Sequence, residues 1–171
     1  AEAAGQPVQA FIDTVTGKFA QLSQTLGISH DGFIRTSAPA HHAGAQKLWS
    51  ACRADDIYRR HYEGLYCVGC ETFYTTKDLV DGKCPEHQVA PERVSEDNYF
   101  FRLSRYAPKL EQLISSGKLE IVPETRRNEV LSFIQMGLED FSISRSLSRA
   151  KGWGVPVPGD ETQVMYVWFD A

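Results

Sequence analysis

The chain has 171 residues, of which 42% are hydrophobic, and its 18 basic and 22 acidic side chains give a formal net charge of -4. This length and apolar content allow a core for one large or two small domains. The negative net charge argues against a protein that coats a polyanion. The sequence contains no run of 18 apolar residues, so it predicts no membrane-spanning helix.

Two helices are predicted first along the chain. Residues 7–27 carry apolar side chains at steps of three and four, with Pro7 in the first turn and Gly27 at the end. The stripe consists of Val8, Phe11, Ile12, Val15, Phe19, Leu22 and Leu26. A second helix is expected over residues 40–53, and its inward-facing residues are Leu48, Trp49 and Cys52.

The middle of the chain alternates between strands and helices. The aromatic segment 57–67 favours a short strand or hairpin, and residues 98–103 favour another strand. A helix is predicted over residues 104–117, with Ser104 as its N-cap, Pro108 in its first turn and Gly117 at its end. Residues 123–137 predict a further helix, which begins at a proline and ends at a glycine.

The last third returns to short strands. Residues 140–145 alternate between polar and apolar side chains, and residues 152–160 form a proline-rich turn. Val164 to Phe169 is a continuous apolar run. Such a run suits a strand that is buried on both faces, as a parallel sheet requires.

Three of the four cysteines lie close together in the segment 66–88, near one histidine. Cys67 and Cys70 are separated by two residues, and Cys84 and His87 repeat that spacing after thirteen intervening residues. Three thiolates and an imidazole are a ligand set that zinc binds as a tetrahedron. Because all four positions would be filled by protein atoms, the predicted metal is structural, and it would stabilise a hairpin too small to fold alone.

Two other interpretations of the cysteines are weaker. A redox Cys-x-x-Cys motif should open a helix in a βαβ unit, whereas Val68 and Gly69 lie between strand-like segments. A disulfide would leave an odd cysteine and would ignore His87. Clustered cysteines of this kind fit a reducing compartment, and residues 1–13 lack the pattern of a secretion signal, so we expect a cytoplasmic protein.

Six long strings of the sequence resemble bacterial methionyl-tRNA synthetases and occur in the same order. They are YEGLYCVGC, NYFFRLSRY, RRNEVLSFI, GLEDFSISR, WGVPVP and YVWFDA. The resemblance covers nearly the whole chain and implies an α/β fold, part of a Rossmann-type nucleotide-binding catalytic domain with an inserted zinc-knuckle connective domain. The implied domains are the helical end of the first Rossmann half (1–55), the insertion (56–160) and the first core strand of the second half (161–171).

The resemblance also assigns roles to single residues. Cys67, Cys70, Cys84 and His87 match the zinc ligands. Trp168 and Ala171 match positions in the methionine pocket, where an aromatic face would contact the thioether favourably. Arg145 matches an arginine that is needed for activation. The pattern places it at the end of a predicted strand, where α/β proteins hold ligands, but by itself favours a structural role. The resemblance implies either charge compensation near the adenylate or anchoring of a carboxylate.

The resemblance implies a methionine–tRNA ligase whose substrates are methionine, ATP with Mg²⁺, and tRNA, with zinc as a structural cofactor. The two ATP-handling signatures of the family, His-Ile-Gly-His and Lys-Met-Ser-Lys-Ser, do not occur in the 171 residues. We therefore expect an excerpt of the enzyme that binds zinc but does not activate methionine alone. The alternative is a free-standing zinc-stabilised module that binds tRNA through Arg59, Arg60 and His61.

Overall fold

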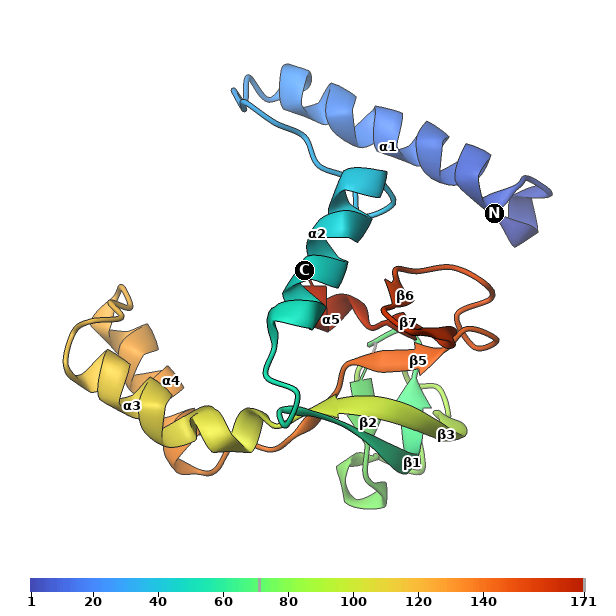
Figure 1. Cartoon of the computed structure of the whole chain (residues 1–171). Coiled ribbons are helices and arrows are strands. Elements are labelled where there is room, and N and C mark those ends of the chain that lie inside the picture. Colours follow the sequence, from blue (N-terminus) through green and yellow to red (C-terminus); the bar gives the residue numbers. More distant parts are fainter. Residues whose placement is uncertain (71, 171) are drawn as a thin grey trace. The chain divides into compact units, whose positions relative to one another are not determined.

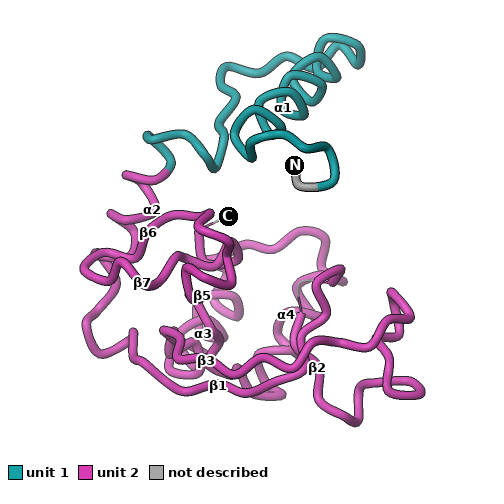
Figure 2. Tube along the Cα trace, turned by 90° about the vertical axis from the view of Figure 1, so that its right-hand side faces the viewer, with its two compact units in different colours: residues 1–41 teal, residues 42–171 magenta. Residues whose placement is uncertain are grey.

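The structure is a computed structural model that describes residues 1–70 and 72–170. The chain divides into two compact units, residues 1–41 and residues 42–171, shown in different colours in Figure 2. Each unit is described by itself. The predicted domain borders at residues 55 and 160 stay predictions.

The first unit contains the short 3-10 helix η1 (Glu2–Ala4) and the helix α1 (Val8–Thr25), which confirms the helix predicted over residues 7–27. Pro7 is the N-cap of α1, and Gly27 follows it in the left-handed region with φ +64°. The apolar stripe is present, but none of the residues of α1 is buried within the chain.

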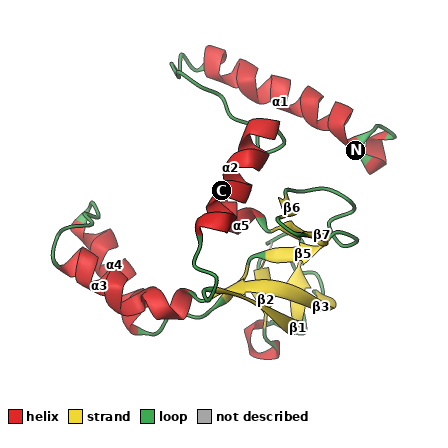
Figure 3. Cartoon of the chain, viewed as in Figure 1, coloured by secondary structure: helices red, strands yellow, loops and turns green. Residues whose placement is uncertain are grey.

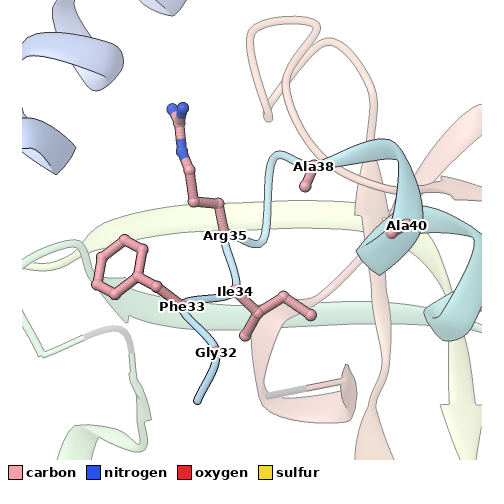
Figure 4. Close-up of a pocket in the computed structure, with 6 residues that line it drawn as sticks. All are labelled: Gly32, Phe33, Ile34, Arg35, Ala38 and Ala40. Atoms are coloured by element: carbon pink, nitrogen blue, oxygen red, sulfur yellow. The ribbon is translucent and has the colours of Figure 1, made fainter. Parts of the chain in front are cut away.

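A loop after α1 forms an open hollow of about 550 Å³ within the same unit. Its lining residues are Gly32, Phe33, Ile34, Arg35, Ala38 and Ala40, and their side chains point in different directions (Figure 4). The Arg35 guanidinium donates to the Asp13 carboxylate of α1 over 2.5 Å, which ties this loop to the helix.

The second unit has its core between the helix α2 (Pro39–Ala51) and the strands. The buried cluster consists of Ala45, Trp49, Ile143, Val155, Val157 and Met165. The Trp49 ring packs edge-on against Tyr99 and Phe169, with centroid distances of 5.5 and 5.3 Å. Ala45 and Trp49 are four residues apart and share one helix face. Leu48 lies off that face and is 49% exposed, so its predicted inward position is wrong.

Seven strands form two sheets among the described residues (Figure 3). The four-stranded sheet has the order β2-β1-β3-β4, and the three-stranded sheet has the order β5-β7-β6. The strands are β1 (Ile57–Cys67), β2 (Thr72–Tyr74), β3 (Glu92–Phe101), β4 (Phe141–Ser142), β5 (Ser144–Ser146), β6 (Pro156–Val157) and β7 (Asp160–Met165). All pairs are antiparallel.

The longest pairing joins β1 and β3, in register from Ile57–Phe101 to Tyr66–Glu92. It confirms the strand predicted over residues 57–67. The strand predicted over residues 98–103 begins earlier, at Glu92, and ends at Phe101. The residues from 92 to 97 are mostly polar and charged, so their strand character comes from pairing with β1 rather than from apolar alternation.

The strand predicted from Val164 to Phe169 is wrong in its second half and in its expected parallel pairing. β7 ends at Met165, and the short helix α5 (Val167–Asp170) follows. Pro158 and Gly159 join β6 to β7 as a tight hairpin, with Gly159 at φ +79°. A hairpin of this length returns the chain antiparallel, whereas parallel strands need a long crossover.

Two helices form a hairpin in which α3 (Ala107–Ser115) lies beside α4 (Glu124–Gln135), as Figure 1 shows. Both helices were predicted, and Pro108 and Gly117 have their predicted places. The predicted N-cap is wrong, because Ser104 lies in the 3-10 helix η3 (Leu103–Tyr106) that precedes α3. Its hydroxyl instead donates to the Asp140 carboxylate over 2.6 Å.

Candidate metal centre and the arginine cluster beside it

Each half of the cysteine cluster is built by a tight local turn. Cys67 is the last residue of β1, and Cys70 follows three residues later, before β2. Cys84 comes after the 3-10 helix η2 (Thr76–Asp78) and the bridge between Val80 and Lys83. The Cys84 carbonyl accepts from the Gln88 amide over 2.9 Å, which turns the chain so that His87 faces the cysteines.

The four predicted ligands meet at one point, with all ligand atoms within 4.8 Å of one another. The His87 Nδ1 atom lies 3.1 Å from Cys70 Sγ, 3.9 Å from Cys67 Sγ and 4.0 Å from Cys84 Sγ. Cys70 Sγ and Cys84 Sγ are 3.3 Å apart. In a tetrahedron with the usual zinc bond lengths, ligand atoms are about 3.5–3.8 Å apart. The cluster therefore fits one ion at its centre.

Gly69 gives a second test of the fit. A Cβ atom at this position would lie 2.6 Å from Cδ2 and Nε2 of His87, well inside van der Waals contact. The backbone of the first knuckle thus lies directly against the imidazole ring. This contact holds the ring with Nδ1 toward the sulfur atoms, and only glycine allows it.

The hydroxyl of Tyr74 lies beside two of the sulfur atoms. It donates to Cys70 Sγ over 3.3 Å and lies 3.6 Å from Cys84 Sγ. Burial raises the pKa of Cys84, but its hydrogen bonds with the His87 amide, Tyr74, Cys70 and the His87 ring together outweigh burial and lower that pKa to about 6. Tyr74 lowers the pKa of Cys70, whereas burial and the neighbouring thiols raise it, to about 11. A cation at the centre would favour both thiolates.

The geometry also bears on the other interpretations of the cysteines. All four cysteines are free thiols, so the structure contains no disulfide among its described residues. Cys67 closes a strand rather than opening a helix, unlike a redox Cys-x-x-Cys motif. Cys52 follows α2 and stands apart from the cluster, with its Sγ atom 3.5 Å from the Leu48 carbonyl.

Arg145 lies in β5 and points toward two tyrosines. Its guanidinium lies over the Tyr166 ring, 4.1 Å from the centroid, and over the Tyr66 ring at 5.0 Å. Arg145 Nη2 donates to the Tyr66 hydroxyl oxygen over 2.6 Å. Within residues 1–70 and 72–170 the guanidinium forms no ion pair with a carboxylate. Most of its N–H donors therefore remain available for an anionic ligand.

The predicted methionine pocket involves Trp168 and Ala171, and only Trp168 lies among the described residues. Trp168 lies in α5 and is 64% exposed. Ala171 lies outside the described residues. Their assignment stays a prediction.

Sequence reasoning missed Tyr66 and Arg149. The Tyr66 ring is 3% exposed and lies under two guanidinium groups, those of Arg145 and Arg149. The one signal of Tyr66 in the sequence is its place directly before Cys67, the first cysteine of the cluster. The contact with Arg149 joins residues 83 positions apart, and no periodic pattern could indicate it.

Comparisons with known proteins agree on one family. A profile of the family described as tRNA synthetases class I (M) matches residues 1–93 and 87–171. The chain is 43% identical over its whole length to "Methionine--tRNA ligase, chloroplastic/mitochondrial" of Arabidopsis thaliana, of which it covers 28%. It is 44% identical, over 98% of its length, to "Methionine--tRNA ligase" of Caldanaerobacter subterraneus, of which it covers 26%.

A solved structure is also similar: Mycobacterium tuberculosis methionyl-tRNA synthetase in complex with methionyl-adenylate has a TM-score of 0.87 at 42% identity. The match covers 99% of this chain and 34% of that one. The chain thus spans about a quarter to a third of the length of the relatives it matches. The similarity confirms the predicted fold class, part of the α/β catalytic domain of such an enzyme. Within the described residues, no helix is long and apolar enough to cross a membrane.

Proposed function

Because the chain belongs to the class I tRNA synthetases (M), we propose that the whole protein that carries it is a methionine–tRNA ligase. Its substrates would be methionine, ATP with Mg²⁺, and tRNA, and it would work in the cytoplasm. The observation that carries this proposal is the match in sequence and fold along the full 171 residues to proteins named as methionine–tRNA ligases.

The metal bound at Cys67, Cys70, Cys84 and His87 would be a structural zinc ion. Three sulfur atoms and one imidazole nitrogen suit zinc, and they leave no coordination position open for water. Structural zinc sites of this kind contribute an apparent binding free energy of about 10–16 kcal/mol in small zinc-finger peptides near neutral pH. That amount is enough to hold the loop between β1 and β3, where β2 adds only three residues of pairing.

Arg145 would act on negative charge in the activation step, in which the methionine carboxylate attacks the α-phosphate of ATP. A fixed guanidinium stabilises the anionic groups that meet there. Two roles fit its free N–H donors: compensating charge near the adenylate, or anchoring the methionine carboxylate. Trp168 and Ala171 would line the pocket for the methionine side chain, where an indole face contacts a thioether favourably.

The second candidate, a free-standing module that binds tRNA, has less support. Its proposed basic residues on β1 are largely neutralised by their own chain. Arg59 lies 3.4 Å from the Asp160 carboxylate, and His61 lies 3.0 Å from Asp97. Arg60 packs over the Phe100 ring. A titration of the 171-residue chain with tRNA at several salt concentrations tests this candidate, since phosphate contacts give a steep salt dependence.

Methionine-dependent exchange of pyrophosphate into ATP by the whole protein tests the proposed function. We expect exchange in the wild type and a loss on the order of 100-fold in Arg145→Gln, the size seen when a transition-state donor is removed. Arg126→Gln is the control, because Arg126 is exposed on α4 and forms an ion pair with the neighbouring Glu129. Trp168→Ala should raise the KM for methionine.

Two results would contradict the proposal: no methionine-dependent exchange by the wild type, or full activity in Arg145→Gln. The 171-residue chain alone is expected to give no exchange, because its residues include neither ATP-handling signature.

A further inference from the structure

Tyr66 contacts Arg145 through its side chain and directly precedes Cys67 of the candidate metal centre in β1. Its ring is almost fully buried and packs against Phe73 of β2 at a centroid distance of 4.9 Å. The phenol oxygen accepts from Arg145 Nη2 over 2.6 Å. A buried tyrosine hydroxyl that accepts a hydrogen bond from a cation fixes the position of that cation in two ways, by the bond and by the ring.

A second guanidinium completes the cluster around the Tyr66 ring. Arg149 lies over it at 4.4 Å from the centroid and is held by Glu96 of β3, with Nη1 3.7 Å from Oε1. Glu96 also accepts from the Ser146 hydroxyl over 2.9 Å. The ring is thus held from the side of β3 and β5, and its hydroxyl is left to bind Arg145.

The backbone position of Tyr66 depends on the cysteine cluster. Tyr66 directly precedes Cys67, which is fully buried and is the last residue of β1. The pair Tyr66–Glu92 is also the last one between β1 and β3. Beyond this point β1 has one more residue, Cys67, which pairs with Thr72 of the short strand β2. Whatever holds Cys67 therefore also holds the end of β1 that carries Tyr66.

We propose that Tyr66 is a positioning residue that holds the Arg145 guanidinium in place, and that it makes the position of Arg145 depend on metal bound at Cys67. The inference rests on the proposed function only for the consequence that a displaced Arg145 lowers the rate of methionine activation. The contact itself is a property of the fold and is tested without catalysis.

The direct test is nitrogen NMR of arginine side chains in the 171-residue chain loaded with zinc. We expect Arg145 to give slowly exchanging Nη–H signals, which Arg145→Lys identifies by their loss. Tyr66→Phe should remove this protection because the acceptor oxygen is gone. Tyr62→Phe is the matched control, since Tyr62 lies on the same strand and packs on Phe73 and Phe100.

Removal of zinc by a chelator tests the dependence on the metal. In the wild type it should remove the protection of the Arg145 signals, as Tyr66→Phe does, whereas in Tyr66→Phe it should cause little further change. Protection that survives Tyr66→Phe, or that survives zinc removal in the wild type, would overturn the inference.

Kinetics of the whole protein give the functional readout. Tyr66→Phe should lower kcat for pyrophosphate exchange on the order of tenfold, as expected for one lost hydrogen bond to a charged group, with a smaller change in the KM for methionine. Adding Tyr66→Phe to Arg145→Lys should cost little more, because the two residues act as one unit. Tyr62→Phe should stay near the wild type.

The two failures are distinguishable. If the wild type lacks methionine-dependent exchange, the proposed function fails, and the NMR result alone decides the role of Tyr66. If exchange is present and Arg145→Lys impairs it while Tyr66→Phe leaves kcat unchanged, the inference about Tyr66 is wrong and the proposed function stands.

Discussion

Gly69 carries the tightest constraint of the candidate metal centre. Gly69→Ala would place a methyl group 2.6 Å from the His87 ring and push the imidazole away from the three sulfur atoms. We expect zinc affinity to fall about 10- to 100-fold, the usual effect of disturbing the groups that orient a metal ligand. Competition with a chromophoric chelator measures this. Gly44→Ala is the control, because its new Cβ would meet open space; equal affinities for both variants would argue against the contact.

Asp56 is a buried carboxylate whose protonation should affect stability. It accepts hydrogen bonds from the Tyr106 hydroxyl and from Arg105 Nη1. Both bonds hold its pKa below the usual 3.8, and the bond from Tyr106 has the larger effect. Because the folded-state pKa is the lower one, its stabilising effect is complete above the unfolded-state pKa and disappears as pH falls through the folded value.

Asp56→Asn should therefore lower the free energy of unfolding at pH 7, and the difference from the wild type should shrink as the pH falls below 4. Urea unfolding at several pH values measures it, with wild type and variant compared at the same pH because the zinc site loses its metal in acid. Asp31→Asn, in an exposed loop, is the control and should change the free energy of unfolding little. A cost of Asp56→Asn that stays constant between pH 7 and pH 3 would contradict the assigned role.

At the scale of single residues, the sequence predicted the ligand set and missed its surroundings. The cluster of Cys67, Cys70, Cys84 and His87 could be found because metal ligands must follow a fixed spacing in the chain, and their binding of a metal stays a prediction. The contact of Arg145 with Tyr66 could not, since it joins β5 to β1 across 79 positions and depends on how the two sheets pack. The role of Trp168 came only from the resemblance to a family and stays a prediction.

At the scale of elements, the metal should stabilise one segment more than the others. In the described part of the loop from Cys67 to Val89, the supports are three residues of β2, one isolated bridge and the cluster of four candidate ligands. β7, in contrast, is paired on both sides, and its end lies in the buried core. A chelator should therefore release the loop while β7 stays folded.

Hydrogen exchange with and without a chelator checks this. Amides of Lys83, Cys84 and Gln88, which are hydrogen-bonded in the loop, should lose protection when zinc is removed. The Met165 amide, which donates to the Val155 carbonyl over 2.7 Å, should keep it. Equal loss at both places would mean that the ion holds the whole unit together, and no loss would mean that the loop folds without metal.

The predicted elements succeeded where one periodicity dominated. The helices α1, α3 and α4 have clear apolar spacing or proline and glycine at their ends, so their existence was predictable. The run from Val164 to Phe169 is continuously apolar and has no period. A buried strand and a buried helix cannot be told apart in such a run. The turn over residues 152–160 was predicted, but not that Pro158 and Gly159 form a tight hairpin, which fixes the antiparallel direction of β7.

At the scale of the whole molecule, the fold class followed from long matching strings rather than from composition. The structure matches the Mycobacterium tuberculosis methionyl-tRNA synthetase over 99% of this chain, yet its described strands pair only antiparallel. Pattern reasoning alone would have expected a parallel sheet here. At the candidate metal centre the residues themselves were sufficient. The spacing of the cysteines and the histidine, the type of their donor atoms and their geometry in the structure all favour one bound ion.

The most direct test of the account is the spectrum of the protein after cobalt(II) replaces the metal. We predict one equivalent per chain, with tetrahedral bands and charge-transfer absorption from three thiolates, and Cys84→Ser should keep the tetrahedral bands but lose part of that absorption. A chain that takes up no cobalt, or that binds it in an octahedral site without thiolate absorption, would contradict the account.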